Sequence, residues 1–141
     1  MASIRKEVLI EAPADAVWDA VRDVGQVHRR LVPGVLTDAR LEDAARVVTF
    51  ASGMVVRELI VDLNDEQRRF AYAATGGRAS HHNASIQVVP VDERRCRLVW
   101  VTDVLPDMLA SSIGALVEEG ARVMKQTLEG TPRSRSTRRK R

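Results

Sequence analysis

The chain has 141 residues, enough for one domain with a sizeable core, and its contents of 45% hydrophobic and 29% charged residues are ordinary for a globular protein. Its net charge of +3 comes from one end, because residues 131–141 hold six arginines and lysines and no acid. Without those six, 16 basic residues face 19 acidic ones. We expect residues 1–130 to form the domain and the basic tail to be disordered. An apolar leader or a run of about 20 apolar residues is missing, so we expect a cytoplasmic protein.

Cysteine and histidine usage gives no indication of a metal site or a cofactor. A single cysteine, Cys96, cannot form an internal disulfide, and its apolar, alternating neighbours predict a buried thiol. His81 and His82 are adjacent, and neighbouring residues of a strand point to opposite faces of a sheet. Gly76-Gly77 is typical of a turn between strands, without the pattern of a phosphate-binding loop. We therefore expect neither a metal ion nor a cofactor.

The first third of the chain predicts one strand followed by two short helices. Residues 4–10 alternate between apolar and charged side chains, as a half-buried strand does. Pro13 and Asp15 suit the first turn of a helix, whose apolar residues then recur at helical spacing until Gly25. A second helical segment over residues 27–32 ends at Pro33-Gly34, which favours a turn.

Between residues 35 and 105 the apolar residues alternate with a period of two. The segments are separated by short stretches rich in Gly, Asp, Asn, Glu and Ser, which favour turns. Such short connections allow only antiparallel pairing, because parallel strands need a long crossover. The predicted strands cover residues 35–41, 46–51, 55–63, 69–75, 83–91 and 97–105.

Residues 107–130 predict one long helix, with Asp107 as its cap and Gly130 followed by Pro132 as its end. Its apolar stripe needs a partner, and the only large one available is the sheet. A curled sheet crossed by a single helix leaves a hollow between the two, so we predict an α+β fold with a cavity. Gly120 interrupts the stripe, and it either leaves that space open or permits close packing against a strand. The apolar stripe consists of Leu109, Ile113, Leu116, Val117, Val123, Met124 and Leu128.

Short motifs occur in the segments 10–18, 33–35, 56–58, 68–72, 83–88 and 98–100. In this order and spacing they resemble the START/Bet v 1-like (SRPBCC) superfamily, in particular its polyketide cyclase/dehydrase-type branch of small bacterial proteins. The resemblance covers about residues 4–129 and implies a helix-grip fold, in which seven curved antiparallel strands and a long C-terminal helix enclose a hydrophobic cavity. It constrains function less, because members range from lipid carriers to aromatase/cyclases.

Candidate site residues follow from which side chains share a face of each strand. Arg57 shares parity with an apolar set, so we place it in the cavity, with the alternative that the opposite face, with Glu58, Ile60 and Asp62, is the inner one. Tyr72 is either a cavity wall with one hydroxyl or plain core. Trp100 is expected to line the cavity or to pack beneath the last helix, whose Ile113, Val117 and Met124 complete the predicted ligand-binding set.

His82 lies on the same face of its strand as Ala84, Ile86 and Val88. It is either a weak candidate for a general base or a histidine at a strand end whose hydrogen bonds are satisfied. Tyr72 is the other weak catalytic candidate. Trp18, on the first helix, is expected to be a core anchor rather than a ligand contact.

Three functions compete at this level. The first is binding of a small, largely hydrophobic molecule, such as a polyketide, a lipid-like or an aromatic compound. The second is a polyketide aromatase/cyclase, which needs an acid and a base in one cavity, and the sequence offers no convincing pair. The third is weak, salt-dependent binding of nucleic acid or an anionic membrane through Arg133–Arg141. Oligomeric state is not predicted.

Overall fold

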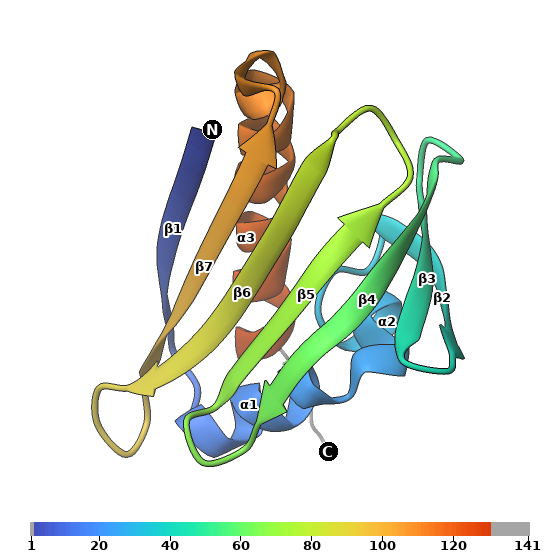
Figure 1. The fold of residues 1–141 in the computed structure, drawn as a ribbon. Helices are drawn as coiled ribbons and strands as arrows, with labels where there is room; N and C mark the ends of the chain where they lie inside the picture. The colour runs from blue at the N-terminus through green and yellow to red at the C-terminus, as the bar shows by residue number, and fades with distance from the viewer. Residues whose placement is uncertain (1, 131–141) are drawn as a thin grey trace.

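The computed structural model describes residues 2–130, which fold as one curved antiparallel sheet crossed by a long helix (Figure 1). The strand order is β1-β7-β6-β5-β4-β3-β2. All seven predicted strands are present, each within about two residues of its expected ends, and the predicted antiparallel pairing is confirmed. The strands are β1 (Ala2–Ile10), β2 (Leu36–Glu42), β3 (Ala45–Phe50), β4 (Val55–Asn64), β5 (Arg69–Thr75), β6 (His81–Pro90) and β7 (Cys96–Leu105).

The first strand pairs with the last. β1 runs antiparallel to β7 in unbroken register from Ala2 opposite Val104 to Ile10 opposite Cys96. The sequence predicts both strands but not this pairing, because the two segments are far apart in the chain. The pairing sets β1 beside the last helix, α3 (Ala110–Glu129), and α1 (Ala14–Arg22) follows directly after β1.

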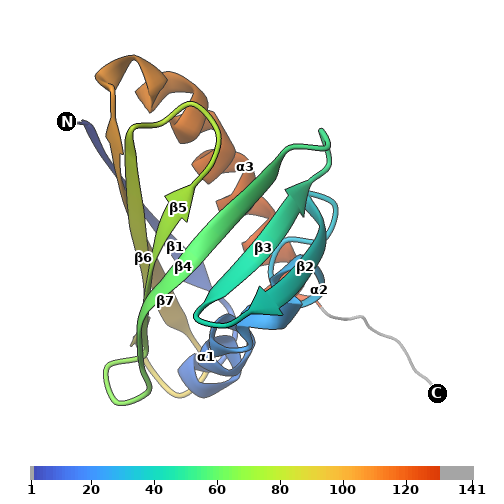
Figure 2. The same cartoon turned by 45° about the vertical axis from the view of Figure 1, so that its right-hand side comes forward.

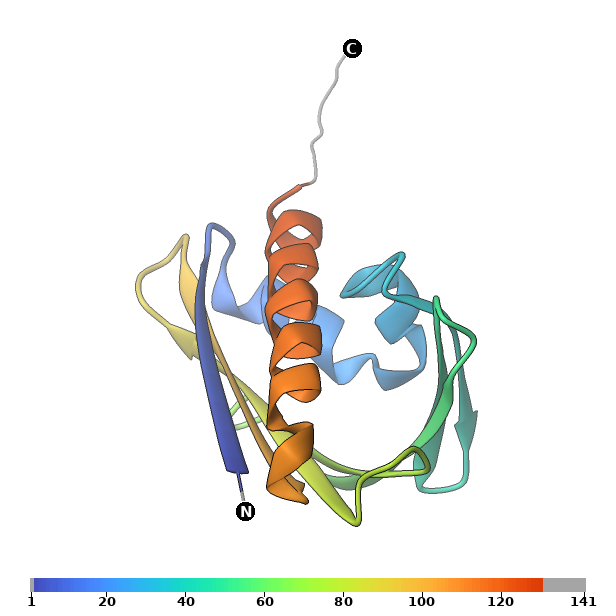
Figure 3. The ribbon, with the colours of Figure 1, turned by 90° about the horizontal axis from the view of Figure 1, so that it is seen from above.

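The helices lie on the concave side of the sheet. Figures 2 and 3 show the sheet curling from β1 round to β2, with α3 crossing the hollow and α1 and α2 (Val27–Arg30) closing one end. A 3₁₀ turn, Val24–Gln26, joins α1 to α2 at the expected glycine. Within residues 2–130, no helix combines the length and the apolarity that a bilayer crossing requires.

The start of α3 differs from the prediction. Asp107 does not cap this helix, because Asp107–Leu109 form a separate 3₁₀ turn and Leu109 occupies the N-cap position without a side-chain bond. The end is as predicted: the backbone N–H of Gly130 donates to the carbonyl of Gln126 at 2.9 Å and closes the last turn. The basic tail, with Arg133–Arg141, lies outside the described residues.

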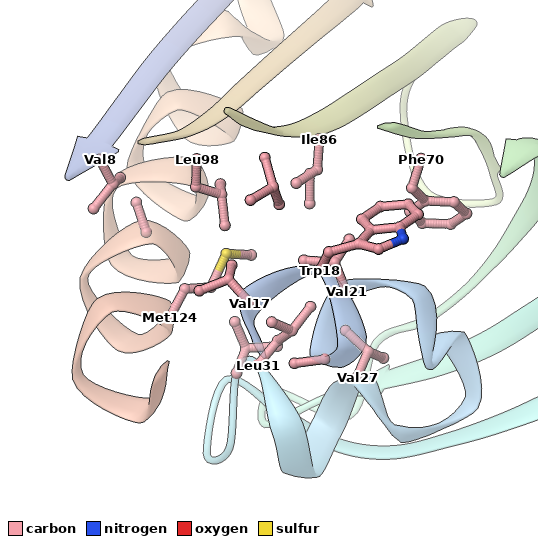
Figure 4. Packing of buried hydrophobic residues seen from close by; sticks show 14 of the residues in the cluster. Val8, Val17, Trp18, Val21, Val27, Leu31, Phe70, Ile86, Leu98 and Met124 are labelled. Carbon is pink, nitrogen blue, oxygen red and sulfur yellow. The ribbon is translucent and has the colours of Figure 1, made fainter. Parts of the chain in front are cut away.

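The main core lies between α1, α2, α3 and the inner face of the sheet (Figure 4). Cys96 is fully buried there, as predicted. Trp18 is 6% exposed, and its indole Nε1 donates to Asp65 Oδ1 at 2.9 Å. It is therefore the core anchor that the sequence predicts, and it does not line the cavity described below.

Candidate ligand cavity

A cavity of about 100 Å³ lies between the concave face of the sheet, the α1–α2 segment and α3. The helical segments supply its apolar walls: Val21, Val27 and Leu31 on one side, and Ile113, Val117 and Met124 on the other. Figure 4 shows four of the lining residues within the packed core: Val21 and Leu31 from the helical segments, Ile86 from the sheet and Met124 from α3. The inner face of the sheet supplies the polar groups, which are Arg46, Glu58, Tyr72, His82, Trp100 and Thr102.

Gly120 lines this cavity and also lets α3 approach β7. A Cβ atom at this position would lie 3.0 Å from Cζ3 and 3.1 Å from Cη2 of Trp100, closer than ordinary van der Waals contact. The two interpretations of Gly120 from the sequence are thus compatible, because the absent side chain both admits the indole ring and leaves the wall of the cavity open.

A buried ion pair joins β3 to β4 at the polar side of the cavity. Arg46 and Glu58 lie directly opposite each other in the β3–β4 register, and Nε of Arg46 donates to Oε1 of Glu58 at 2.7 Å. The two side chains are only 5% and 12% exposed, so water screens the pair little. The guanidinium also stacks on two aromatic rings, with Cζ 5.0 Å from the ring centre of Phe70 and 5.4 Å from that of Tyr72.

The other titratable groups of the cavity are held neutral. Burial raises the pKa of Tyr72 well above its ordinary value of 10, and the nearby charge of Glu58 adds to the rise while Arg46 opposes it. Burial lowers the pKa of His82 below its ordinary value of 6.5, and the negative charge of Glu58 opposes this shift. At neutral pH the phenol and the imidazole are therefore both uncharged.

One buried donor at the cavity has no partner. The indole N–H of Trp100 lies near the Tyr72 side chain, and this polar interaction opposes the rise in the pKa of Tyr72. The indole nitrogen nevertheless makes no hydrogen bond of normal distance and angle. Nε1 of Trp100 is therefore buried and unpaired among the described residues. Such a group is rare, because an unpaired buried donor loses its bonds to water without compensation. Ala84 lies between Tyr72 and Thr102 in the cross-strand register, so only a short side chain separates these two polar residues.

The structure gathers six of the seven predicted ligand-binding residues around this cavity: Tyr72, His82, Trp100, Ile113, Val117 and Met124. Arg57 is the exception, and its predicted placement is wrong. Its side chain is 43% exposed on the opposite face of β4, where Nε lies 3.6 Å from Glu42 Oε1. The alternative holds for Glu58, which lines the cavity, and for Ile60, which packs against the core, but not for Asp62, which is exposed. Whether any of the six residues binds a ligand stays a prediction.

Arg46 is the polar residue that sequence reasoning missed. The run from Ala45 to Val48 is buried on both faces, so its alternation does not reveal which side chains point inward. The available signal was an acid and a base, Arg46 and Glu58, at facing positions of a short hairpin. Within residues 2–130, no group of three or more acidic, histidine or cysteine side chains is arranged to hold a metal ion.

Fold and cavity together define a helix-grip protein: a curved antiparallel sheet, a long C-terminal helix and a mostly apolar hollow between them. The family model described as polyketide cyclase/dehydrase and lipid transport matches residues 1–130, and the chain belongs to this family, within the START/Bet v 1-like superfamily. No curated protein is similar enough in sequence to be matched.

Solved structures show the same fold at low sequence identity. A protein from Bacillus thuringiensis has a TM-score of 0.82 at 14% identity, over 90% of this chain and 98% of that one. Norcoclaurine synthase from Thalictrum flavum, a point mutant in complex with a transition-state analogue, has a TM-score of 0.69 at 18% identity over 90% and 93%. The di-domain ARO/CYC protein BexL, from the BE-7585A biosynthetic pathway, has a TM-score of 0.74 at 15% identity, over 92% of this chain and 47% of BexL.

Proposed function

We propose that this domain binds a small, largely hydrophobic ligand in the cavity between the sheet and α3. The observation that carries the proposal is an apolar space of about 100 Å³ that contains a buried, unpaired indole N–H. Burial of apolar ligand surface would supply the driving force, at roughly 25 cal/mol per Å². The polar groups on one side of the space would fix the orientation of the ligand. The family description, which includes lipid transport, supports the same function.

Native mass spectrometry of the purified protein tests this proposal. We expect a bound small molecule with the wild type, and its loss in Val117→Phe, because the larger ring fills the space beside α3. Met108→Phe is the matched control, since Met108 is 82% exposed and does not line the cavity. A Val117→Phe protein that keeps the bound small molecule would contradict binding in this cavity. So would a wild-type protein that carries no ligand and takes up none from a mixture of apolar compounds.

A second candidate is a cyclase of the aromatase/cyclase type, and one observation favours it. Glu58, Tyr72 and His82 line a single cavity, which is the combination of base and acid that the sequence alone did not indicate. The neutral imidazole of His82 could accept a proton from a carbon between two carbonyl groups, while the phenol of Tyr72 donates one to a carbonyl oxygen. BexL, whose name includes ARO/CYC, shares the fold.

Turnover of a soluble poly-β-ketone analogue by wild type, His82→Gln and Tyr72→Phe tests this second candidate. We expect both variants to lose most of the activity while keeping the ligand seen in native mass spectra. Unchanged turnover in either variant would remove that residue from the chemistry. No turnover by the wild type would leave the binding function as the one supported.

A further inference from the structure

The cavity has no net charge. Among the described residues, Arg46 and Glu58 are the only two charged side chains that line it at neutral pH, and they are bonded to each other. Arg46 is further occupied by its two ring contacts and by Nη1, which donates to the Val24 carbonyl at 3.3 Å. An anionic ligand bound beside this pair would be repelled by Glu58, and Arg46 would not be free to pair with it. A bound cation would meet Arg46 in the same way.

The hydrogen-bond groups of the cavity favour a ligand with an acceptor. The indole N–H of Trp100 can only donate, and it is buried without a partner in the described residues. The Tyr72 side chain also faces this space, from the strand position opposite Ala84. Its hydroxyl can either donate or accept a hydrogen bond. An oxygen of a hydroxyl or carbonyl group placed beside Trp100 would satisfy the buried donor without adding charge.

The volume limits the size of the ligand. At about 100 Å³ the cavity is far below the roughly 300–1,000 Å³ typical of sites for drug-sized molecules. It is closer to the engineered apolar cavities of about 150 Å³ that accommodate benzene. Leu116 lines the cavity and is 38% exposed, so the cavity comes close to the surface at this side chain.

We propose that the ligand is an uncharged molecule of about the size of one six-membered ring, bearing a hydroxyl or carbonyl oxygen that accepts a hydrogen bond from Trp100, and that the Arg46–Glu58 pair excludes charged analogues. This inference rests on the proposed binding function and narrows it to a ligand class. Single-ring phenols and cyclic ketones belong to this class. Ring acids and ring amines do not.

Four probes of one ring size test the class: phenol, toluene, benzoate and benzylammonium, each titrated into ¹⁵N-labelled wild-type protein at pH 7. The chain has two tryptophans and therefore two indole N–H signals. Trp18 is already bonded to Asp65 and lies outside the cavity, so its signal is the internal control. We expect phenol to move the Trp100 signal downfield, and toluene to bind without that downfield shift. We expect both charged probes to bind at least about tenfold more weakly than phenol.

Glu58→Gln tests the role of the ion pair directly, because it leaves the charge of Arg46 uncompensated at nearly constant shape. We expect its benzoate affinity to rise about tenfold or more. Glu42→Gln removes the same charge from the outer face, where Glu42 is 45% exposed beside Arg57, and should leave benzoate affinity unchanged.

Benzoate binding as tight as phenol in the wild type would overturn the inference. So would phenol binding that leaves the Trp100 signal in place, or a failure of all four probes to bind. None of these results affects the copurified ligand or its loss in Val117→Phe, so a failure of the ligand class is distinguishable from a failure of the binding function.

Discussion

Arg46→Met is the substitution whose effect the structure predicts most sharply. It removes the cation from a pair whose side chains are 5% and 12% exposed, and leaves the carboxylate of Glu58 facing an apolar cavity. Removing one partner of a buried ion pair costs about 3–5 kcal/mol, mainly because the remaining charge is uncompensated. Arg57→Met makes the same change on the outer face, where Arg57 and Glu42 are 43% and 45% exposed, and should cost less than about 1 kcal/mol.

Urea unfolding of the two variants, monitored by circular dichroism, measures both free energies. We expect the double variant Arg46→Met/Glu58→Met to recover most of the lost stability, because apolar replacement of a whole buried pair is often neutral or stabilising. A loss in Arg46→Met no larger than in Arg57→Met would refute the reasoning. A double variant as unstable as the single one would show that the loss comes from packing rather than from charge.

Three further predictions concern single side chains. Gly120→Ala places a Cβ about 3.0 Å from Trp100, so we expect thermal unfolding to show a loss of about 1 kcal/mol, whereas a gain would mean that the indole moves aside freely. Because the pKa of His82 is lowered in the folded state, the unfolded chain binds a proton on this imidazole more readily than the folded chain does. The stability that depends on a neutral His82 is therefore fully present above pH 6.5, and it is lost as the pH falls from 6.5 toward the lower pKa of the folded state. His82→Gln should therefore lose less stability than wild type between about pH 7 and pH 5 in urea titrations, and equal losses would contradict this. Trp18→Phe deletes the 2.9 Å hydrogen bond to Asp65 and should lower the free energy of unfolding in urea by about 1 kcal/mol. In the double variant with Asp65→Asn, the two losses should be less than additive, because both substitutions affect the same hydrogen bond.

The sequence predicts the inner face correctly where alternation is regular. On β5, β6 and β7 the residues that share parity with Tyr72, His82 and Trp100 are mostly apolar, and these three side chains do face the cavity. The long C-terminal helix is equally predictable, because its apolar stripe continues for more than four turns and needs one large partner. The spacing of apolar residues is therefore enough to predict the fold and most of the residues that line the cavity.

β4 is the strand on which the same reasoning fails. Its apolar residues Val55, Leu59 and Val61 are 54%, 36% and 63% exposed, so the more apolar parity lies on the outside. A register shift between Ile60 and Asp62 breaks the alternation further along the strand. The inner face instead carries Glu58, a residue type that is seldom buried unless it is paired. Its partner Arg46 is supplied by another strand, and single-strand patterns contain no information about such a pair.

The cavity and the ion pair are both unhelpful to stability, and they occur at the same place. At roughly 24 cal/mol per Å³, an empty space of about 100 Å³ costs on the order of 2 kcal/mol. A buried ion pair gives little or no net stability over apolar residues of the same volume. Apolar residues in place of both Arg46 and Glu58 would be the direct route to a more stable core. A chain that instead keeps the hollow, the neutral pair and an unpaired indole N–H together has the arrangement expected of a site for a small uncharged ligand.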